Sequence, residues 1–136
     1  MAAETAESKE ETMIETTHLI IRQSKWDDLS DFYQWERMPE VTEFFSIKDD
    51  QTGEDVARKY IEDEKDPKAL QFTIMLKEEG GLRNIGRIVL ADIERGWKAE
   101  VWRIYIADTA LRGKGYGKEA MLGIMTYCCL LYTSDA

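Results

Sequence analysis

A short segment rich in glycine and basic residues, residues 111–121, has the composition of a phosphate-binding loop. The first N–H groups of a helix lack intrahelical partners and together carry about half a positive charge. Glycine lets an anion approach such a backbone closely. A β-like run, residues 99–106, precedes the loop, and an amphipathic helical pattern follows it. The order therefore predicts a strand, a glycine loop and a helix that hold a phosphate group. The loop residues are Arg112, Gly113, Lys114, Gly115, Tyr116, Gly117 and Lys118.

Two common phosphate loops do not fit this segment. A P-loop requires G-x-x-x-x-G-K-[ST], but the stretch from Gly113 to Lys118 is one residue too short and is followed by Glu119. The dinucleotide fingerprint G-x-G-x-x-G requires a glycine where Lys118 stands. The pattern that fits is [RQ]-x-x-G-x-[GA], from Arg112 to Gly117, and it resembles the acetyl-CoA pyrophosphate loop of the GNAT N-acetyltransferase superfamily. The alternative is an ordinary exposed turn between a strand and a helix.

The resemblance extends over residues 17–128, an N-acetyltransferase domain. Residues 17–23 resemble the first strand of the subgroup that contains ribosomal-protein and spermidine acetyltransferases, with His18 in place of the usual arginine. Residues 39–42 resemble the segment after that subgroup's first helix, with Met38 in place of an aspartate.

Hydrophobic periodicity gives the order of the elements. Residues 17–23 predict a strand, and residues 70–77, 84–93 and 98–106 predict three more in succession, separated by short turns. Capping boxes at Ser24/Asp27 and Thr52/Asp55 each begin a helix, and Pro39 ends the first. A last helix follows at residues 117–128. The order β-α-α-β-β-β-α predicts an α+β class, a mostly antiparallel sheet with helices packed on it, which the resemblance identifies as a partial GNAT fold.

Composition indicates one domain of a cytoplasmic protein. The chain has 136 residues, 43% of them hydrophobic, and contains neither a membrane-length apolar run nor a signal peptide. Cys128 and Cys129 are adjacent, which fits neither a disulfide framework nor a zinc site and indicates a reducing compartment. A net charge of −9 argues against nucleic acid as a partner. The acidic residues 1–16 predict a disordered leader. A homo-oligomer is left open.

Two interpretations apply to residues 129–136. The octapeptide resembles the translation of a sequencing-library adapter, which predicts a non-native tail and a domain whose C-terminal strands are missing. The alternative is a genuine helix end. On the first interpretation, we expect these 136 residues alone to be a poor or inactive catalyst.

The resemblance implies direct transfer of an acetyl group from acetyl-CoA to an amine, without a metal. Backbone groups of the fourth strand, at Ile104, Tyr105 and Ile106, then pair with the pantetheine arm and face the thioester oxygen. Glu100 on that strand is a candidate general base, and an outward-facing surface charge is the equal alternative. No general acid is assigned, because the family's tyrosine lies beyond this sequence.

Other residues with functional side chains have structural explanations. We expect a structural role for His18 and a core position for Cys128. An acidic set near the first two helices either attracts a polyamine or a basic N-terminus as the acceptor, or forms a solvated face. A competing function is a non-catalytic domain that binds or senses acyl-CoA. The acidic set comprises Glu36, Glu40, Glu43, Asp49 and Asp50.

Overall fold

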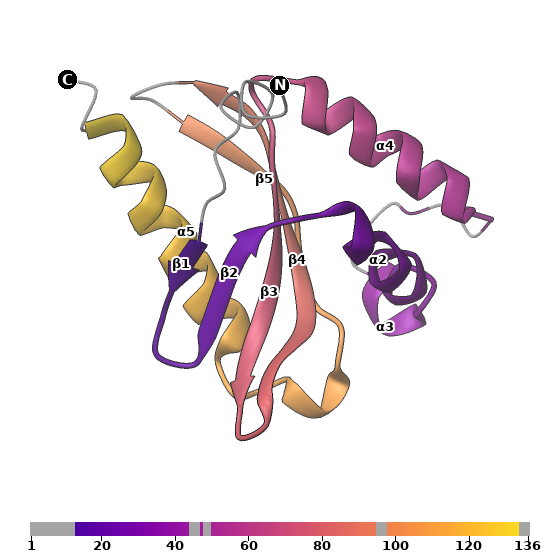
Figure 1. Cartoon of the computed structure of the whole chain (residues 1–136), viewed down its shortest axis with the longest axis horizontal. Helices are drawn as coiled ribbons and strands as arrows, with labels where there is room; N and C mark the ends of the chain where they lie inside the picture. The colour runs from indigo at the N-terminus through magenta and orange to yellow at the C-terminus, as the bar shows by residue number, and fades with distance from the viewer. Residues whose placement is uncertain (1–12, 44–46, 48–49, 95–97, 134–136) are drawn as a thin grey trace.

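The computed structural model describes residues 13–43, 47, 50–94 and 98–133. Within these residues five strands form one antiparallel sheet in chain order, β1-β2-β3-β4-β5 (Figure 1). The α+β class expected from the sequence is confirmed, and so are the three consecutive strands before the last helix. The strands are β1 Met13–Glu15, β2 Leu19–Gln23, β3 Leu70–Glu78, β4 Gly81–Glu94 and β5 Lys98–Ile106.

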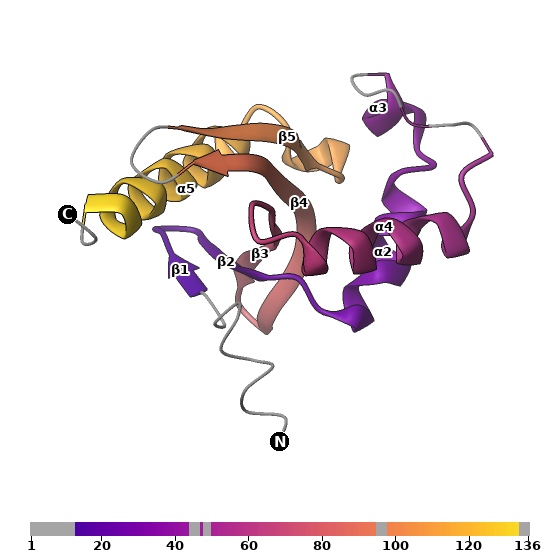
Figure 2. The same cartoon turned by 90° about the horizontal axis from the view of Figure 1, so that it is seen from above.

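Helices lie on both faces of the sheet. Figure 2 shows the long helix α5 on one face, with α2 and α4 on the other. None of the helices in the described ranges is long and apolar enough to cross a bilayer. The helices are η1 Trp26–Asp28, α2 Leu29–Trp35, α3 Pro39–Thr42, α4 Gly53–Lys65, η2 Thr109–Leu111 and α5 Tyr116–Thr133.

The structure differs from the sequence prediction at both ends of the described chain. Residues 13–15 were expected to belong to a disordered leader, but they form β1, which pairs with β2 and sets Ile14 opposite Ile21. Ile14 packs against the core, and this burial orders the strand. Residues 1–12 of the predicted leader lie outside the described residues. Helix α5 continues to Thr133 and so includes residues 129–133 of the predicted tail.

One capping box is where the sequence predicted it, and the other is displaced. At the start of α4, the Asp55 N–H donates to Thr52 Oγ1 and the Thr52 N–H donates to Asp55 Oδ2, both at 3.0 Å. The box predicted at Ser24 is wrong by one residue, because the Lys25 N–H donates to Asp28 Oδ2 at 2.8 Å. Asp28 is fixed in this position by Arg22, whose Nη1 lies 2.7 Å from Oδ2.

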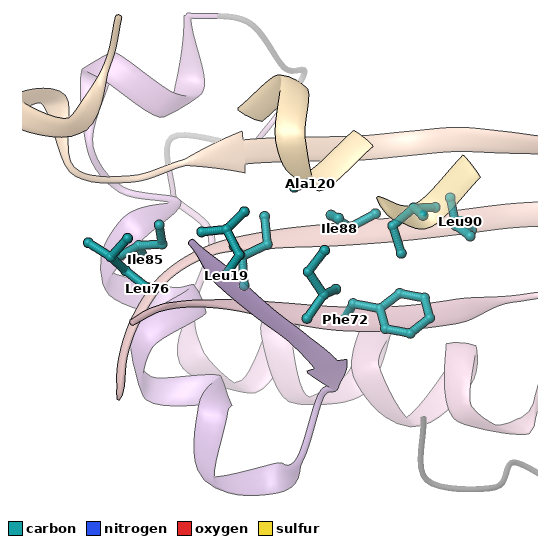
Figure 3. Packing of buried hydrophobic residues seen from close by; sticks show 10 residues of the cluster. Leu19, Phe72, Leu76, Ile85, Ile88, Leu90 and Ala120 are labelled. Atoms are coloured by element: carbon teal, nitrogen blue, oxygen red, sulfur yellow. The ribbon is translucent and has the colours of Figure 1, made fainter. Parts of the chain in front are cut away.

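The main core lies between the sheet and α5. Figure 3 shows side chains of β2, β3 and β4 packed together beneath α5. The helix comes close to the sheet at Gly123, where an added Cβ would lie 3.1 Å from Thr16 Cγ2. The buried members are Leu19, Ile21, Phe72, Ile74, Leu76, Ile85, Ile88, Leu90, Ala120 and Ile124.

The close contact of β4 with β5 at Gly86 leads to a prediction on stability. A Cβ at Gly86 would lie 2.2 Å from the Tyr105 carbonyl oxygen, which is a backbone atom and cannot rotate away. We expect Gly86→Ala to lower the free energy of unfolding by about 1–3 kcal/mol, as overpacking does. Gly80→Ala is the matched control, since a Cβ there meets nothing within 4 Å. Urea denaturation of both variants measures the difference, and equal stabilities would contradict the steric argument.

Candidate functional site

A cleft of about 790 Å³ opens between β5 and the N-terminal end of α5. Nine of the ten residues that the sequence assigned to a cofactor line it, whereas Lys114 does not. Leu111, Met121 and Glu40 complete the lining. The structure thus brings the predicted strand positions and the predicted loop together around one space. The nine are Ile104, Tyr105, Ile106, Arg112, Gly113, Gly115, Tyr116, Gly117 and Lys118.

The loop has the backbone conformation that its glycines permit. Gly113 and Gly115 have φ of 84° and 83°, a left-handed region that other residues rarely adopt. Before the loop, Asp108 Oδ1 accepts the Ala110 N–H at 2.9 Å and so caps η2. Arg112 Nη2 donates to the Glu40 carbonyl at 2.8 Å, which joins the loop to α3. The N-terminal end of the loop is therefore held in place before any ligand binds.

The first turn of α5 offers unpaired N–H groups to the cleft. The Glu119 N–H donates to the Gly115 carbonyl at 2.9 Å, so intrahelical bonding begins there. The preceding N–H groups, at Tyr116, Gly117 and Lys118, have no intrahelical acceptor. A Cβ at Gly117 would meet nothing closer than Ile106 Cγ1 at 3.9 Å, so the space in front of the helix end is open. This geometry suits a phosphate group.

Glu100 lies on β5 away from the cleft. Its side chain is exposed and lines neither this cleft nor a second, smaller pocket on the α2 and α4 side of β5. Glu100 pairs with Ala91 on β4, next to the pair formed by Leu90 and Val101. Leu90 packs in the core beneath α5, and neighbouring strand residues face opposite sides of the sheet. Glu100 therefore faces α4. Four residues of strand separate it from Ile104, roughly 13 Å at full extension. A base at Glu100 would have to act through water.

On the other face of β5, a buried carboxylate binds two arginines. Glu36 accepts hydrogen bonds from Arg87 Nη1 at 2.6 Å, Arg103 Nη1 at 2.9 Å and the Tyr105 hydroxyl at 2.7 Å. Burial raises the pKa of Glu36, but the charges of Arg87 and Arg103 and the hydrogen bond from Tyr105 outweigh it and leave the pKa below its ordinary value. Glu36 is therefore not part of an acidic surface, and its assignment to the acidic set was wrong. Glu43 and Asp50 are exposed, Glu40 is half-buried at the cleft, and Asp49 lies outside the described residues.

Tyr105 connects the two faces. The residue lines the cleft near α5, and its hydroxyl donates to Glu36 near α2. Burial and the adjacent Glu36 carboxylate raise its pKa well above the ordinary value. The phenol thus stays protonated and bound to Glu36, so it is not available to protonate a group in the cleft.

His18 and Cys128 have the structural positions expected from the sequence. His18 Nδ1 lies 2.8 Å from Glu119 Oε1, and the His18 N–H donates to Glu119 Oε2 at 2.7 Å. Burial raises the pKa of Glu119, but hydrogen bonds from Thr16 and His18 outweigh it and lower the pKa. Cys128 packs against the main core. In the described part of the chain, no three His, Cys, Asp or Glu side chains are arranged to hold a metal ion.

Comparison with family models identifies the domain. Residues 18–133 match the model described as an acetyltransferase (GNAT) domain. The chain belongs to this family. The match covers strands β2 to β5 and the glycine loop. No curated protein sequence matches the chain significantly.

Solved structures have the same fold. A domain from Methanocaldococcus jannaschii superposes with a TM-score of 0.73 at 21% identity, covering 84% of this chain and 72% of that one. A GCN5-related N-acetyltransferase from Brucella melitensis superposes with a TM-score of 0.68 at 16% identity, covering 92% of this chain and 57% of that one. A putative GnaT-family acetyltransferase from Bordetella pertussis gives a TM-score of 0.63 at 14% identity, covering 85% and 70%. This chain therefore spans little more than half of the Brucella protein.

Proposed function

We propose that this GNAT domain transfers an acetyl group from acetyl-CoA to a primary amine in the cytoplasm. The supporting observation is the cleft near α5, where two left-handed glycines and the open first turn of α5 lie beside β5. Arg112 and Lys118 supply positive charge to the same cleft. A CoA pyrophosphate needs both the backbone N–H groups and the cations. A polyamine, a protein N-terminus and a small-molecule amine are the acceptor classes proposed from the sequence.

The edge position of β5 supports a role in binding the pantetheine arm. In the sheet of described strands, β5 pairs with β4 on one side only. On an edge strand, the N–H and C=O groups of alternate residues face outward. The Ala107 N–H donates to the Ile85 carbonyl on β4, so by alternation Tyr105 also faces β4. The outward backbone groups are therefore those of Ile104 and Ile106. An amide-bearing arm laid along this edge would pair with them as an added strand does. One of these N–H groups would then polarise the thioester oxygen.

The reaction requires one base and one proton donor. The neutral amine attacks the thioester carbonyl carbon, the C–N bond forms, and the C–S bond breaks to release the CoA thiolate. A base takes a proton from the acceptor nitrogen, and the thiolate gains a proton. Glu100, acting through water, is our proposed base. Glu36 is unsuitable, because its buried carboxylate is already bound by two arginines.

A variant at the helix end tests the cofactor site. Gly117→Val should weaken CoA binding at least about tenfold, because the side chain would occupy the anion's place and remove charge-assisted hydrogen bonds. The fold should persist, since a Cβ fits there. Gly53→Val, the same change at the first residue of α4, is the matched control, because a Cβ there also meets open space. Isothermal titration measures both, and unchanged affinity in Gly117→Val would refute the site.

Turnover separates the enzyme from a non-catalytic acyl-CoA-binding module. Acetylation of an amine panel by the full-length gene product is followed by thiol release. Acetylation supports the transferase. Tight CoA binding without turnover would favour the binding module.

A further inference from the structure

A second pocket, of about 230 Å³, lies on the α2 and α4 side of β5. Four charged side chains belong to its described lining, and three of them are cationic: Lys59, Arg87 and Arg103. Glu36 is the single carboxylate. The lining therefore has a net charge of +2, although the whole chain carries −9. Positive charge is therefore concentrated in this pocket, although the protein as a whole is acidic.

One indole ring contacts two of these cations. Lys59 Nζ lies 5.0 Å from the centroid of the Trp102 ring, and Arg103 Cζ lies 4.3 Å from it. The ring attracts each cation. An anion beside this ring would be attracted by the positive charge of both side chains. Lys59 also contacts Asp63, whose Oδ1 is 3.2 Å away on the next turn of α4, so one carboxylate already offsets part of its charge.

The deeper wall of the pocket is rigid. Arg87 is buried, bound to Glu36 through Nη1 and to Gln71 through Nη2, and stacked 4.2 Å from the Phe32 ring centroid. Its Nε is buried and has no hydrogen-bond partner among the described residues. Arg103 is held by Glu36 at 2.9 Å. The cations are thus positioned before any ligand arrives, which reduces the entropic cost of binding an anion.

The pocket adjoins the proposed acetyl-transfer site. Trp102 and Arg103 precede Ile104 directly on β5, and an irregularity in the register with β4 falls at this point. The two cavities lie on opposite sides of one strand. Tyr105 links them, because it lines the cleft near α5 and its hydroxyl donates to Glu36, which lines the pocket. Since β5 is an edge of the sheet of described strands, a molecule held by Lys59 and Arg103 would reach the thioester around this edge.

We propose that this pocket binds a carboxylate group of the acceptor, so that the domain acetylates a primary amine that also carries a carboxylate. The inference rests on the proposed acetyl transfer. It differs from the polyamine suggested by the acidic residues, and Glu36, the member of that set within this pocket, is already bound by Arg87 and Arg103. The amine end points toward β5, and the carboxylate end lies against Lys59, Trp102 and Arg103.

Three probes of equal chain length test the assignment: δ-aminovalerate, pentylamine and cadaverine. They end in a carboxylate, a methyl group and an ammonium group, respectively, and share a primary amine. Each is titrated into the ¹⁵N-labelled chain while the indole N–H resonance of Trp102, assigned with Trp102→Phe, is followed. We expect δ-aminovalerate to bind at least about tenfold more tightly than either other probe, because only it makes a charge-assisted contact.

Two lysine variants on α4 locate the site. Lys59→Gln should weaken δ-aminovalerate binding roughly tenfold and leave pentylamine unchanged. Lys65→Gln removes the same charge from the same helix outside the pocket and should change neither. Equal binding of the three probes, tighter cadaverine binding, no binding of δ-aminovalerate, or equal effects of the two variants would overturn the inference. A separate CoA titration shows which of the two proposals fails. If CoA binds but δ-aminovalerate does not, only the carboxylate-binding role of the pocket is overturned. Loss of CoA binding overturns the proposed function, and with it the acceptor role.

Discussion

Replacing Glu36 by glutamine is expected to lower the free energy of unfolding by about 3–5 kcal/mol, because it leaves two buried arginines without their anion. The glutamine amide would also place N–H donors against donors, since Glu36 Oε2 accepts from both Arg87 and Tyr105. Both guanidinium groups are almost fully buried, so water cannot replace the lost carboxylate. Chemical denaturation measures the change.

The same variant should change how the free energy of unfolding depends on pH. The pKa of Glu36 is lowered below 4.5 in the folded protein, so the unfolded chain binds more protons as the pH falls through this range. The stability contributed by Glu36 is therefore present above about pH 4.5 and is lost as the pH falls toward the lower folded pKa. Glu36→Gln should show a shallower loss of stability below that pH. Asp28 and Glu119, whose pKa values are also lowered, should retain their part of the slope.

Glu62→Gln, an exposed change on α4, is the matched control and should alter stability by less than about 0.5 kcal/mol at any pH. If Glu36→Gln were equally mild, the hydrogen bonds that Glu36 accepts from Arg87, Arg103 and Tyr105 would have no net energetic role. The rigidity assigned to this wall of the pocket would then be refuted.

The fold could be read from the sequence where local patterns and packing agree. Alternating apolar residues predicted β3 because one face of that strand packs beneath α5. Pro39 predicted the end of α2, and Met38 indeed has an extended backbone with ψ of 130°. β1 was missed because three residues in an acidic segment carry too little pattern. Its order depends on pairing with β2 and on the packing of Ile14, and both are tertiary.

The two pockets differ in how far the sequence predicted them. The glycine loop is a local feature, and six of its seven predicted residues line one cleft, although their role in binding a cofactor stays a prediction. Arg87 on β4, Arg103 on β5 and Glu36 at the end of α2 come together only in the folded protein, so no sequence spacing connects them. One signal was present: Arg87 lies between Ile85 and Ile88 in an apolar strand, and an arginine there requires a buried anion. The sequence did not reveal which of the many carboxylates that anion is.

Replacing Glu100 by glutamine is expected to lower kcat by roughly 10²–10⁴ if its carboxylate is the general base. CoA affinity should stay nearly unchanged, because Glu100 does not line the cleft near α5. The variant should also lose the acidic limb of the pH–rate profile, since glutamine has no proton to release. The assay uses the full-length gene product with its preferred amine, and it measures thiol release across the pH range.

Glu100 is exposed and lies far from the proposed thioester site. The side chain is exposed on the α4 side of β5, and roughly 13 Å of strand separates it from Ile104, so a chain of ordered water must carry the proton. Glu79→Gln, in the exposed turn between β3 and β4, controls for the loss of one surface charge and should leave kcat unchanged. A wild-type pH–rate profile in Glu100→Gln would make Glu100 a surface charge. If the amine is then deprotonated in bulk water before it binds, the rate will rise with the neutral fraction of the free amine in both proteins.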